Sequence, residues 1–228
     1  MNVLVLGRGK TGSLVADVVR ERGHHVEVLG RAENENAAGL TPERLANVDV
    51  VVDFTTPHAV LKNVEACLRA KKPLVIGTTG WYAELPRVRS MVDQAKVAVL
   101  YGGNFSIGVN LFYAIARAST AAAQYGYDFH IRETHHVHKK DAPSGTAVAI
   151  ARVLEKNGAH AEISSVREGE NMGRHELRIH SDVDTLTLTH QAESRRGFAL
   201  GAVRAAEWLA AQRHPNLYDF AEIFPELQ

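Results

Sequence analysis

Residue types that can carry out acid–base chemistry are concentrated in residues 133–147. This segment holds three histidines and two lysines directly before a Pro-Ser-Gly-Thr run. Imidazole is the side chain that titrates nearest to neutral pH, and an ammonium group can bind an anion or supply a proton. The segment is therefore the first candidate for a catalytic site.

Pro143 and Ser144 indicate where a helix over residues 145–156 begins. Proline fixes the entry of the chain, and the serine hydroxyl can cap the first turn. The backbone N–H groups of Gly145 and Thr146 would then face outward at the positive end of the helix, which suits a carboxylate. A lysine and an imidazole beside these N–H groups could bind a dianion and supply a proton.

A metal site is the competing interpretation of the same histidines. His136 and His138 would point the same way if the preceding strand continued, and Glu133 or Asp141 could join them. Zinc sites usually need three or four ligands without cationic competition, and two adjacent lysines argue against one. We therefore predict no metal.

A second chemical motif opens the chain. Residues 7–12 form a Gly-x-Gly-x-x-Gly run between an apolar strand and a helix. In that position the glycines allow a tight turn and bring the helix N-terminus close to a pyrophosphate, although the pattern also occurs in turns without a ligand. The motif predicts a dinucleotide site formed by Gly7, Arg8, Gly9, Lys10, Thr11 and Gly12.

The end of the second strand indicates the choice of cofactor. An NAD-specific site usually has an acid there, and this chain has Gly30 and Arg31 instead. The absence of an acid and the presence of the Arg31 guanidinium suit a 2′-phosphate, with Lys10 as a second cation. We therefore predict a preference for NADPH over NADH, the alternative being that Arg31 is a solvated loop charge.

Alternating strands and helices must position the glycine motif. The strands are expected at 3–6, 25–29, 49–54, 73–77 and 97–101, and the helices at 13–22, 57–70 and 84–94. Uniformly apolar strands are typical of a parallel sheet covered on both faces, so we predict a doubly wound, Rossmann-like α/β domain. Phe54, Gly77, Thr78 and Thr79 would follow strands at the carboxyl edge, where ligands bind.

The pattern changes after Tyr101. A helix at 108–124, a strand at 127–134, the helix at 145–156 and antiparallel strands at 175–180 and 185–191 predict a smaller α+β domain with an open mixed sheet. A helix at 199–212 and the segment 217–224 would return to the first domain. The predicted domains are therefore 1–105 with 196–228 for the dinucleotide, and 106–195 for the substrate.

Composition excludes several classes of partner. Lys+Arg and Asp+Glu both number 26, and no cluster of positive charge suggests nucleic acid or an acidic membrane. No apolar run approaches the ~20 residues that cross a bilayer, and no secretory segment opens the chain. A single cysteine, Cys67, rules out an internal disulfide. We expect a cytoplasmic protein.

The run Glu-x-His-His-x-x-Lys-x-Asp-Ala-Pro-Ser-Gly-Thr-Ala resembles the signature of the dihydrodipicolinate (4-hydroxy-tetrahydrodipicolinate) reductase family. The similarity extends over essentially the whole chain and includes residues 7–12, 77–80, 104–110, 195 and 198–202. The His-Lys motif is highly specific, whereas the glycine motif is not.

The resemblance implies NAD(P)H-dependent reduction of 4-hydroxy-tetrahydrodipicolinate, via dihydrodipicolinate, to tetrahydrodipicolinate in lysine biosynthesis. His135 would be the proton donor/acceptor and Lys139 a proton donor. His136, Gly145 and Thr146 would bind the substrate carboxylate. The nicotinamide would be lined by Gly77, Thr78, Thr79, Gly103, Asn104, Phe105 and Ser106. Family members are usually homotetramers built through the second domain's sheet.

Several features depart from the family pattern. Gly30 stands where many relatives have an acid, Gly103 replaces a common alanine, and the chain is short between the active-site helix and the final strands. Three alternatives stay open: a related two-domain NADP oxidoreductase on another small acid, a non-catalytic NADPH-binding sensor, and a metal-dependent hydrolase using the histidines.

Overall fold

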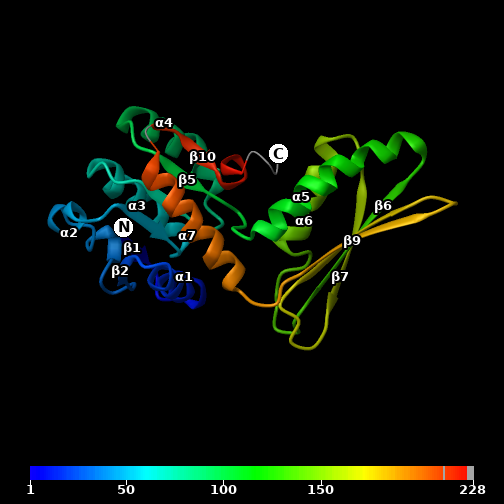
Figure 1. Cartoon of the computed structure of the whole chain (residues 1–228), viewed down its shortest axis with the longest axis horizontal. Helices are drawn as coiled ribbons and strands as arrows, with labels where there is room; N and C mark the ends of the chain where they lie inside the picture. Colours follow the sequence, from blue (N-terminus) through cyan, green and yellow to red (C-terminus); the bar gives the residue numbers. More distant parts are fainter. Residues whose placement is uncertain (213, 225–228) are drawn as a thin grey trace. The chain divides into compact units, whose positions relative to one another are not determined.

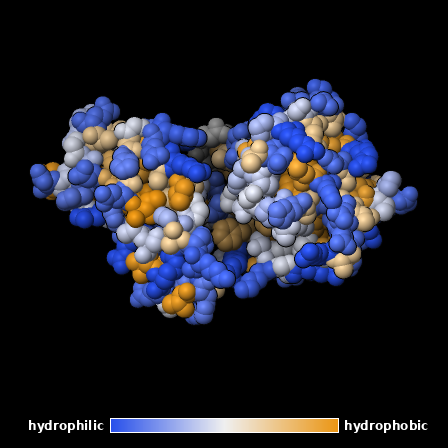
Figure 2. Space-filling view, turned by 180° about the vertical axis from the view of Figure 1, so that it is seen from behind, coloured by the Kyte–Doolittle hydropathy of each residue, from blue (hydrophilic) through white to orange (hydrophobic). Residues whose placement is uncertain are grey.

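The computed structural model describes residues 1–212 and 214–224, and they form two compact units (Figure 1). One unit holds Met1–Ser106 together with the segment that begins at Arg196, and the other holds Ile107–Arg195. Each unit has its own sheet and its own hydrophobic core. On the face drawn in Figure 2, hydrophilic residues cover most of the surface and apolar residues occur in small groups.

The first unit is built on a six-stranded parallel sheet. Its order is β10-β5-β4-β3-β1-β2, with β1 (Asn2–Leu6), β2 (His25–Leu29), β3 (Val50–Asp53), β4 (Leu74–Ile76), β5 (Val99–Tyr101) and β10 (Leu217–Asp219). All five strand pairs are parallel. The predicted doubly wound parallel sheet is therefore confirmed.

Helices cover both faces of this sheet because successive strand residues point to opposite sides. Val3 and Val5 pack with helices α1 (Lys10–Glu21) and α7 (Arg196–Ala211). Leu4 and Leu6 pack with α3 (Pro57–Arg69) and α4 (Leu85–Ala95). A short helix, α2 (Pro42–Ala46), is added after β2 and was not predicted.

The second unit is a mixed four-stranded sheet in the order β7-β6-β8-β9. The strands are β6 (Asp128–His135), β7 (Ala161–Arg167), β8 (Arg174–His180) and β9 (Thr185–Gln191), and only β6 and β7 run parallel. Helices α5 (Ile107–Ser119) and α6 (Gly145–Lys156) pack on one face. The predicted α+β domain with a mixed sheet is confirmed.

Two details of this unit differ from expectation. The helix expected at 108–124 ends at Ser119 and continues as the 3₁₀ segment Thr120–Tyr125. Strand β7 was not predicted, because its sequence Ala-Glu-Ile-Ser-Ser-Val-Arg has little apolar content and pairs only with β6 along one edge. Residues 181–184 connect β8 to β9, and the backbone N–H of Ser181 donates to Asp184 O at 3.0 Å there.

Helix α7 closes the first unit by packing on α1 and on the loop after β5. Arg196 forms an ion pair with Glu21, with Nη1 3.0 Å from Oε1. The closest approach is at Gly201, where an added Cβ would lie 1.8 Å from the carbonyl oxygen of Phe105. None of the described helices is long and apolar enough to span a membrane.

We expect Gly201→Ala to lower the free energy of unfolding by at least about 2 kcal/mol, because the new methyl overlaps Phe105 O. Gly197→Ala is the matched control in the same helix, since its Cβ would meet nothing closer than 3.9 Å. That variant should be neutral or gain up to ~1 kcal/mol from helix propensity. Urea unfolding monitors both variants, and equal stabilities would contradict the close contact.

Candidate active site

The glycine turn between β1 and α1 is shaped by close backbone approach. Gly7 has φ 105°, and a Cβ on Gly12 would lie 2.1 Å from Gly7 O. Gly9 differs, because a Cβ there would meet nothing within 4 Å. It is the N-cap of α1 and provides no side-chain cap. The amino end of α1 therefore presents backbone N–H groups beside open space, which suits a phosphate.

The turn and two strand-end loops line one pocket of about 360 Å³. The loops follow β3 and β4, as the sequence predicted for the carboxyl edge of the sheet. The lining residues are Gly9, Lys10, Thr11, Gly12, Phe54, Thr55, Pro57, Gly77, Thr78 and Thr79. Predicted cofactor residues from three separate segments thus meet at one site.

The predicted residues after β5 lie outside this pocket lining. Phe105 is 2% exposed, and its ring centroid lies 6.1 Å from Phe54 and 4.6 Å from Phe220. Asn104 Oδ1 accepts from Ser106 N at 2.9 Å, and Gly103 is exposed. The buried ring of Phe105 serves the core of this unit, while Gly103 and Asn104 remain accessible.

Asp53 shapes the pocket and was missed by the sequence analysis. It is fully buried at the end of β3 and accepts hydrogen bonds from Thr55 Oγ1 at 2.6 Å, Thr78 Oγ1 at 3.0 Å and Asn63 Nδ2 at 2.8 Å. Burial raises the pKa of its carboxyl group, and these bonds oppose that shift. The signal was an acid ending the apolar run Val-Val-Val-Asp.

Gly30 and Arg31 at the end of β2 are not acidic, as the sequence indicated, but Glu33 from the following turn brings a carboxylate to this position. Glu33 reaches back through the turn, accepts from Gly30 N at 2.5 Å and pairs with Arg8 Nη2 at 2.7 Å. The hydrogen bond from Gly30 is the main cause that holds the pKa of Glu33 below its usual value, and Arg8 adds to it. Arg31 is exposed nearby in sequence. The identity of residue 30 alone could not show that the Glu33 side chain folds back onto Gly30 N.

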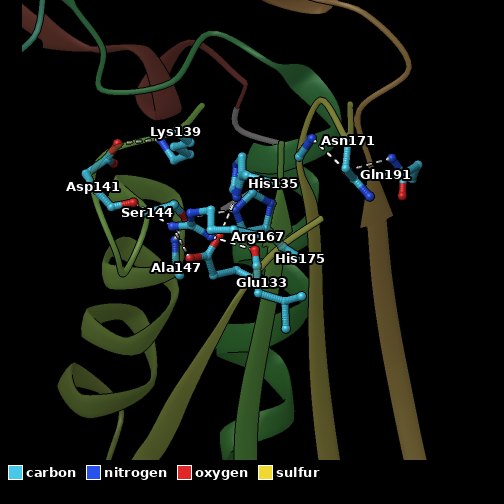
Figure 3. Close-up of polar contacts among 12 residues, drawn as sticks. Glu133, His135, Lys139, Asp141, Ser144, Ala147, Arg167, Asn171, His175 and Gln191 are labelled. Atoms are coloured by element: carbon cyan, nitrogen blue, oxygen red, sulfur yellow. Dashed lines mark hydrogen bonds and ion pairs between the residues drawn. The ribbon is translucent and has the colours of Figure 1, made fainter. Parts of the chain in front are cut away.

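Acid–base residues gather at the end of β6 in the second unit (Figure 3). Glu133 and His135 occupy alternate inward positions, and both are buried. His135 Nδ1 is hydrogen-bonded to one carboxylate oxygen of Glu133, and Arg167 Nη2 donates to the other at 2.9 Å. Lys139 Nζ pairs with Asp141 Oδ1 at 2.8 Å on the following loop.

The start of α6 lies beside this cluster. Ser144 caps the helix as predicted, since its Oγ accepts from Ala147 N at 3.2 Å. Ser144 Oγ also lies 3.1 Å from His175 Nε2, and the His175 and His135 rings are 5.2 Å apart. His175 is 5% exposed and was missed, although it shares the inward face of β8 with Leu177.

Burial lowers the pKa of His175 to about 4. The basic neighbours His135, His190 and Lys139 also lower the pKa of His175, and Glu133 opposes them. The neutral ring at pH 7 can therefore accept the Ser144 hydroxyl proton at Nε2. This bond ties strand β8 to the amino end of α6.

The predicted substrate residues follow from these elements. Gly145 is exposed and Thr146 half-buried in the first turn of α6, and His136 is half-buried just after β6. The strand ends at His135, so His136 and His138 do not continue its alternation. Among the described residues, the group with metal-ligand spacing is instead Glu133, His135 and His175. Arg167 already bonds that carboxylate, so the geometry fits an acid–base cluster better than a metal site.

Comparisons with known proteins point to one family over almost the whole chain. Family models described as "Dihydrodipicolinate reductase, N-terminus" and "Dihydrodipicolinate reductase, C-terminus" match residues 1–105 and 108–224. The 4-hydroxy-tetrahydrodipicolinate reductase of Natronomonas pharaonis is 39% identical over 250 residues, covering 97% of this chain and 99% of that protein. The one of Christiangramia forsetii is 34% identical over 226 residues, covering 92% of each.

A solved structure gives the same result. The dipicolinate-bound dihydrodipicolinate reductase from Paenisporosarcina sp. TG-14 superposes with a TM-score of 0.80 at 26% identity, covering 98% of this chain and 99% of that one. A probable dehydrogenase from Thermotoga maritima, with a TM-score of 0.64 at 12% identity, shares the fold.

We expect acid to destabilise the fold through His175. The unfolded histidine binds a proton near pH 6.5, whereas the buried ring binds one only near pH 4. The unfolded state thus binds more protons in this window, and the free energy of unfolding falls by up to roughly 3 kcal/mol as pH drops through it. Urea unfolding at pH 7, 5.5 and 4 measures the slope.

His175→Gln should flatten this pH dependence, whatever its effect on stability at pH 7. His160→Gln is the control, because the His160 side chain is 80% exposed. An unchanged slope in His175→Gln would show that the acid sensitivity lies elsewhere.

Proposed function

The chain belongs to the dihydrodipicolinate reductase family, and from this we propose that it reduces 4-hydroxy-tetrahydrodipicolinate, via dihydrodipicolinate, to tetrahydrodipicolinate with a nicotinamide cofactor. This reaction is a step of diaminopimelate and lysine biosynthesis. The observation that carries the proposal is the meeting of His135, Lys139 and the amino end of α6 at the end of β6. A non-catalytic sensor or another oxidoreductase has no need of that arrangement.

Substrate recognition rests on the charge of a ring with two carboxylates. The first turn of α6, with Gly145 and Thr146, would hold one carboxylate through backbone N–H groups and the helix dipole. Lys139 is 22% exposed and now pairs with the more exposed Asp141. A substrate carboxylate can replace Asp141 as its partner, and His136 lies next to the same strand end.

Reduction adds one hydride and one proton to the ring. The nicotinamide cofactor supplies the hydride when it is bound. The single proton comes from Lys139 Nζ or from His135 Nε2 when the His135 ring is in its imidazolium form, because a neutral ring with its proton on Nδ1 can only accept at Nε2. The side chain of His135 is largely buried, at 10% exposed.

The first unit fits the cofactor. The uncapped amino end of α1 and the open space at Gly9 suit the pyrophosphate. Phe54 and Gly77–Thr79 line the same pocket and suit the nicotinamide side. Gly103–Ser106, which follow β5, would complete that side when the cofactor binds.

For the adenosine end we propose a preference for NADPH that Glu33 limits. Arg31, Arg8 and Lys10 can face a 2′-phosphate, while the Glu33 carboxylate at Gly30 N can accept from the ribose hydroxyls of NADH. The two halves of the Arg8–Glu33 pair therefore favour opposite cofactors. The chain would use both, with NADPH ahead.

The remaining features follow the family. We propose a homotetramer assembled through the sheet of the second unit, supported by the edge strand β9, whose Leu186 is 56% exposed. The reaction would take place in the cytoplasm, where the reduced nicotinamide pool and the pathway intermediates are available.

We expect Lys139→Gln to lower kcat/KM by about 10²- to 10⁴-fold and to raise KM as well, because Lys139 both binds a carboxylate and supplies a proton. The assay follows nicotinamide absorbance with the condensation product of pyruvate and aspartate semialdehyde. Lys140→Gln is the control, since the adjacent Lys140 is exposed. Equal activity of both variants and the wild type would reject the role of Lys139, and no turnover by the folded wild type would reject the reductase.

We expect Glu33→Gln to raise the NADPH/NADH ratio of kcat/KM about 3- to 10-fold, because it removes a negative charge from the 2′ position and releases Arg8. Arg31→Ala should lower the same ratio. Glu35→Gln, two residues away and exposed, should leave it unchanged. A ratio that stays constant in the first two variants would place cofactor selection elsewhere.

A further inference from the structure

Glu133 is a buried carboxylate with no part in the roles described above. Its side chain is 0% exposed on the central strand β6. Leaving a carboxylate ionised in the interior is costly unless hydrogen bonds and an opposite charge compensate it. Both are present, from His135 and Arg167 (Figure 3). The question is therefore what this buried charge does for the neighbouring His135.

The hydrogen-bond pattern allows only one direction of donation. Arg167 has donors alone, and an ionised carboxylate only accepts. Burial works to raise the pKa of Glu133, but the bonds from Arg167, Ser165 and His135 together hold it below its usual value. Glu133 therefore stays ionised at neutral pH. The proton between Glu133 and His135 must then sit on Nδ1 of the imidazole.

The Nε2 edge of the His135 ring lies close to the backbone of Gly173. A Cβ on Gly173 would lie 2.9 Å from His135 Nε2, and Gly173 has φ 142°, which side chains rarely adopt. Gly173 N donates to Asn171 Oδ1 at 3.0 Å, which holds this loop in place. The space beside Nε2 thus depends on the absence of a side chain at residue 173.

The charged and titratable groups that face His135 come from three strands and from the loop after β6. They are Glu133 on β6, Arg167 on β7, His175 on β8 and Lys139 on the loop after β6. Arg167 Nη2 also donates to the backbone oxygen of Asp141 at 2.5 Å, and the carboxylate of Asp141 is the partner of Lys139. Of these groups only Glu133 bonds the ring, so it alone can set which nitrogen carries the proton.

Building on the proposed function, we infer that Glu133 is a positioning residue that fixes the tautomer of His135: Nδ1 keeps its proton, and Nε2 is the atom that exchanges one with the substrate. Arg167 supports this role, because its ion pair with Glu133 keeps the carboxylate ionised. In Glu133→Gln the amide oxygen must still accept from Arg167, so the amide N–H₂ faces Nδ1. Nδ1 then has to accept, and the proton moves to Nε2.

The tautomer can be measured without turnover. ¹⁵N-histidine-labelled wild-type protein at pH 8, where His135 is neutral because burial lowers its pKa, should show the Nδ1–H pattern of long-range ¹H–¹⁵N couplings. Comparison with His135→Gln assigns the signal, and Glu133→Gln should show the Nε2–H pattern. An Nε2–H tautomer in the wild type would overturn the inference, even if Glu133→Gln does not fold. Failure of the reductase assay would leave this readout intact.

Kinetics then separates positioning from simple support of the fold. Glu133→Gln should lower kcat by roughly 10²- to 10⁴-fold, as an incorrect tautomer does in catalytic triads, with little change in KM. The pH dependence of kcat should also move to lower pH, because a carboxylate stabilises the imidazolium form. Glu133→Asp keeps the charge and should recover part of the activity.

Glu176→Gln is the matched control in the same sheet. Glu176 on β8 pairs with Arg174 at 2.9 Å and is not bonded to His135. It should keep the wild-type tautomer and pH profile. A Glu133→Gln enzyme that loses activity with an unchanged tautomer and an unchanged pH profile would reduce Glu133 to a structural role and contradict the inference.

Discussion

The second unit depends on how one buried negative charge is compensated. Glu133 lies on β6, one of the two inner strands, where water cannot solvate it, so the neighbouring strands must supply donors. Arg167 comes from β7, and its second bond reaches the backbone of Asp141 on the loop that carries Lys139. Through Arg167, this carboxylate therefore links the ring of His135 to the loop that carries Lys139.

The first unit also contains a buried carboxylate that is compensated by hydrogen bonds. Asp53 is buried at the end of β3 and accepts hydrogen bonds from Thr55 and Thr78. These two threonines lie on neighbouring loops and line the pocket beside the glycine turn. The glycine turn needs no polar support, because bare backbone is what a phosphate requires there. Each candidate site thus combines an accessible helix N-terminus with a buried carboxylate that fixes its surroundings.

Local sequence patterns predicted the features that depend on interactions between residues close in the chain. The apolar strands, the Gly7–Gly12 turn and the Ser144 cap all follow from short-range geometry and were found correctly. The partners of those elements depend on tertiary contacts that no spacing encodes. Glu33 returns across a turn, and His175 meets Ser144 from another strand. Arg167 lies on a strand too polar to be recognised, which is why the support of His135 was missed.

The central claim is that the substrate binds where β6 ends and α6 begins. A crystal structure of the chain with dipicolinate and a nicotinamide cofactor tests it most directly. The account predicts one carboxylate within about 2.7–3.2 Å of Gly145 N and Lys139 Nζ, and the ring facing His135 Nε2. Dipicolinate bound away from these residues, in a well-ordered crystal with the cofactor in place, would contradict it.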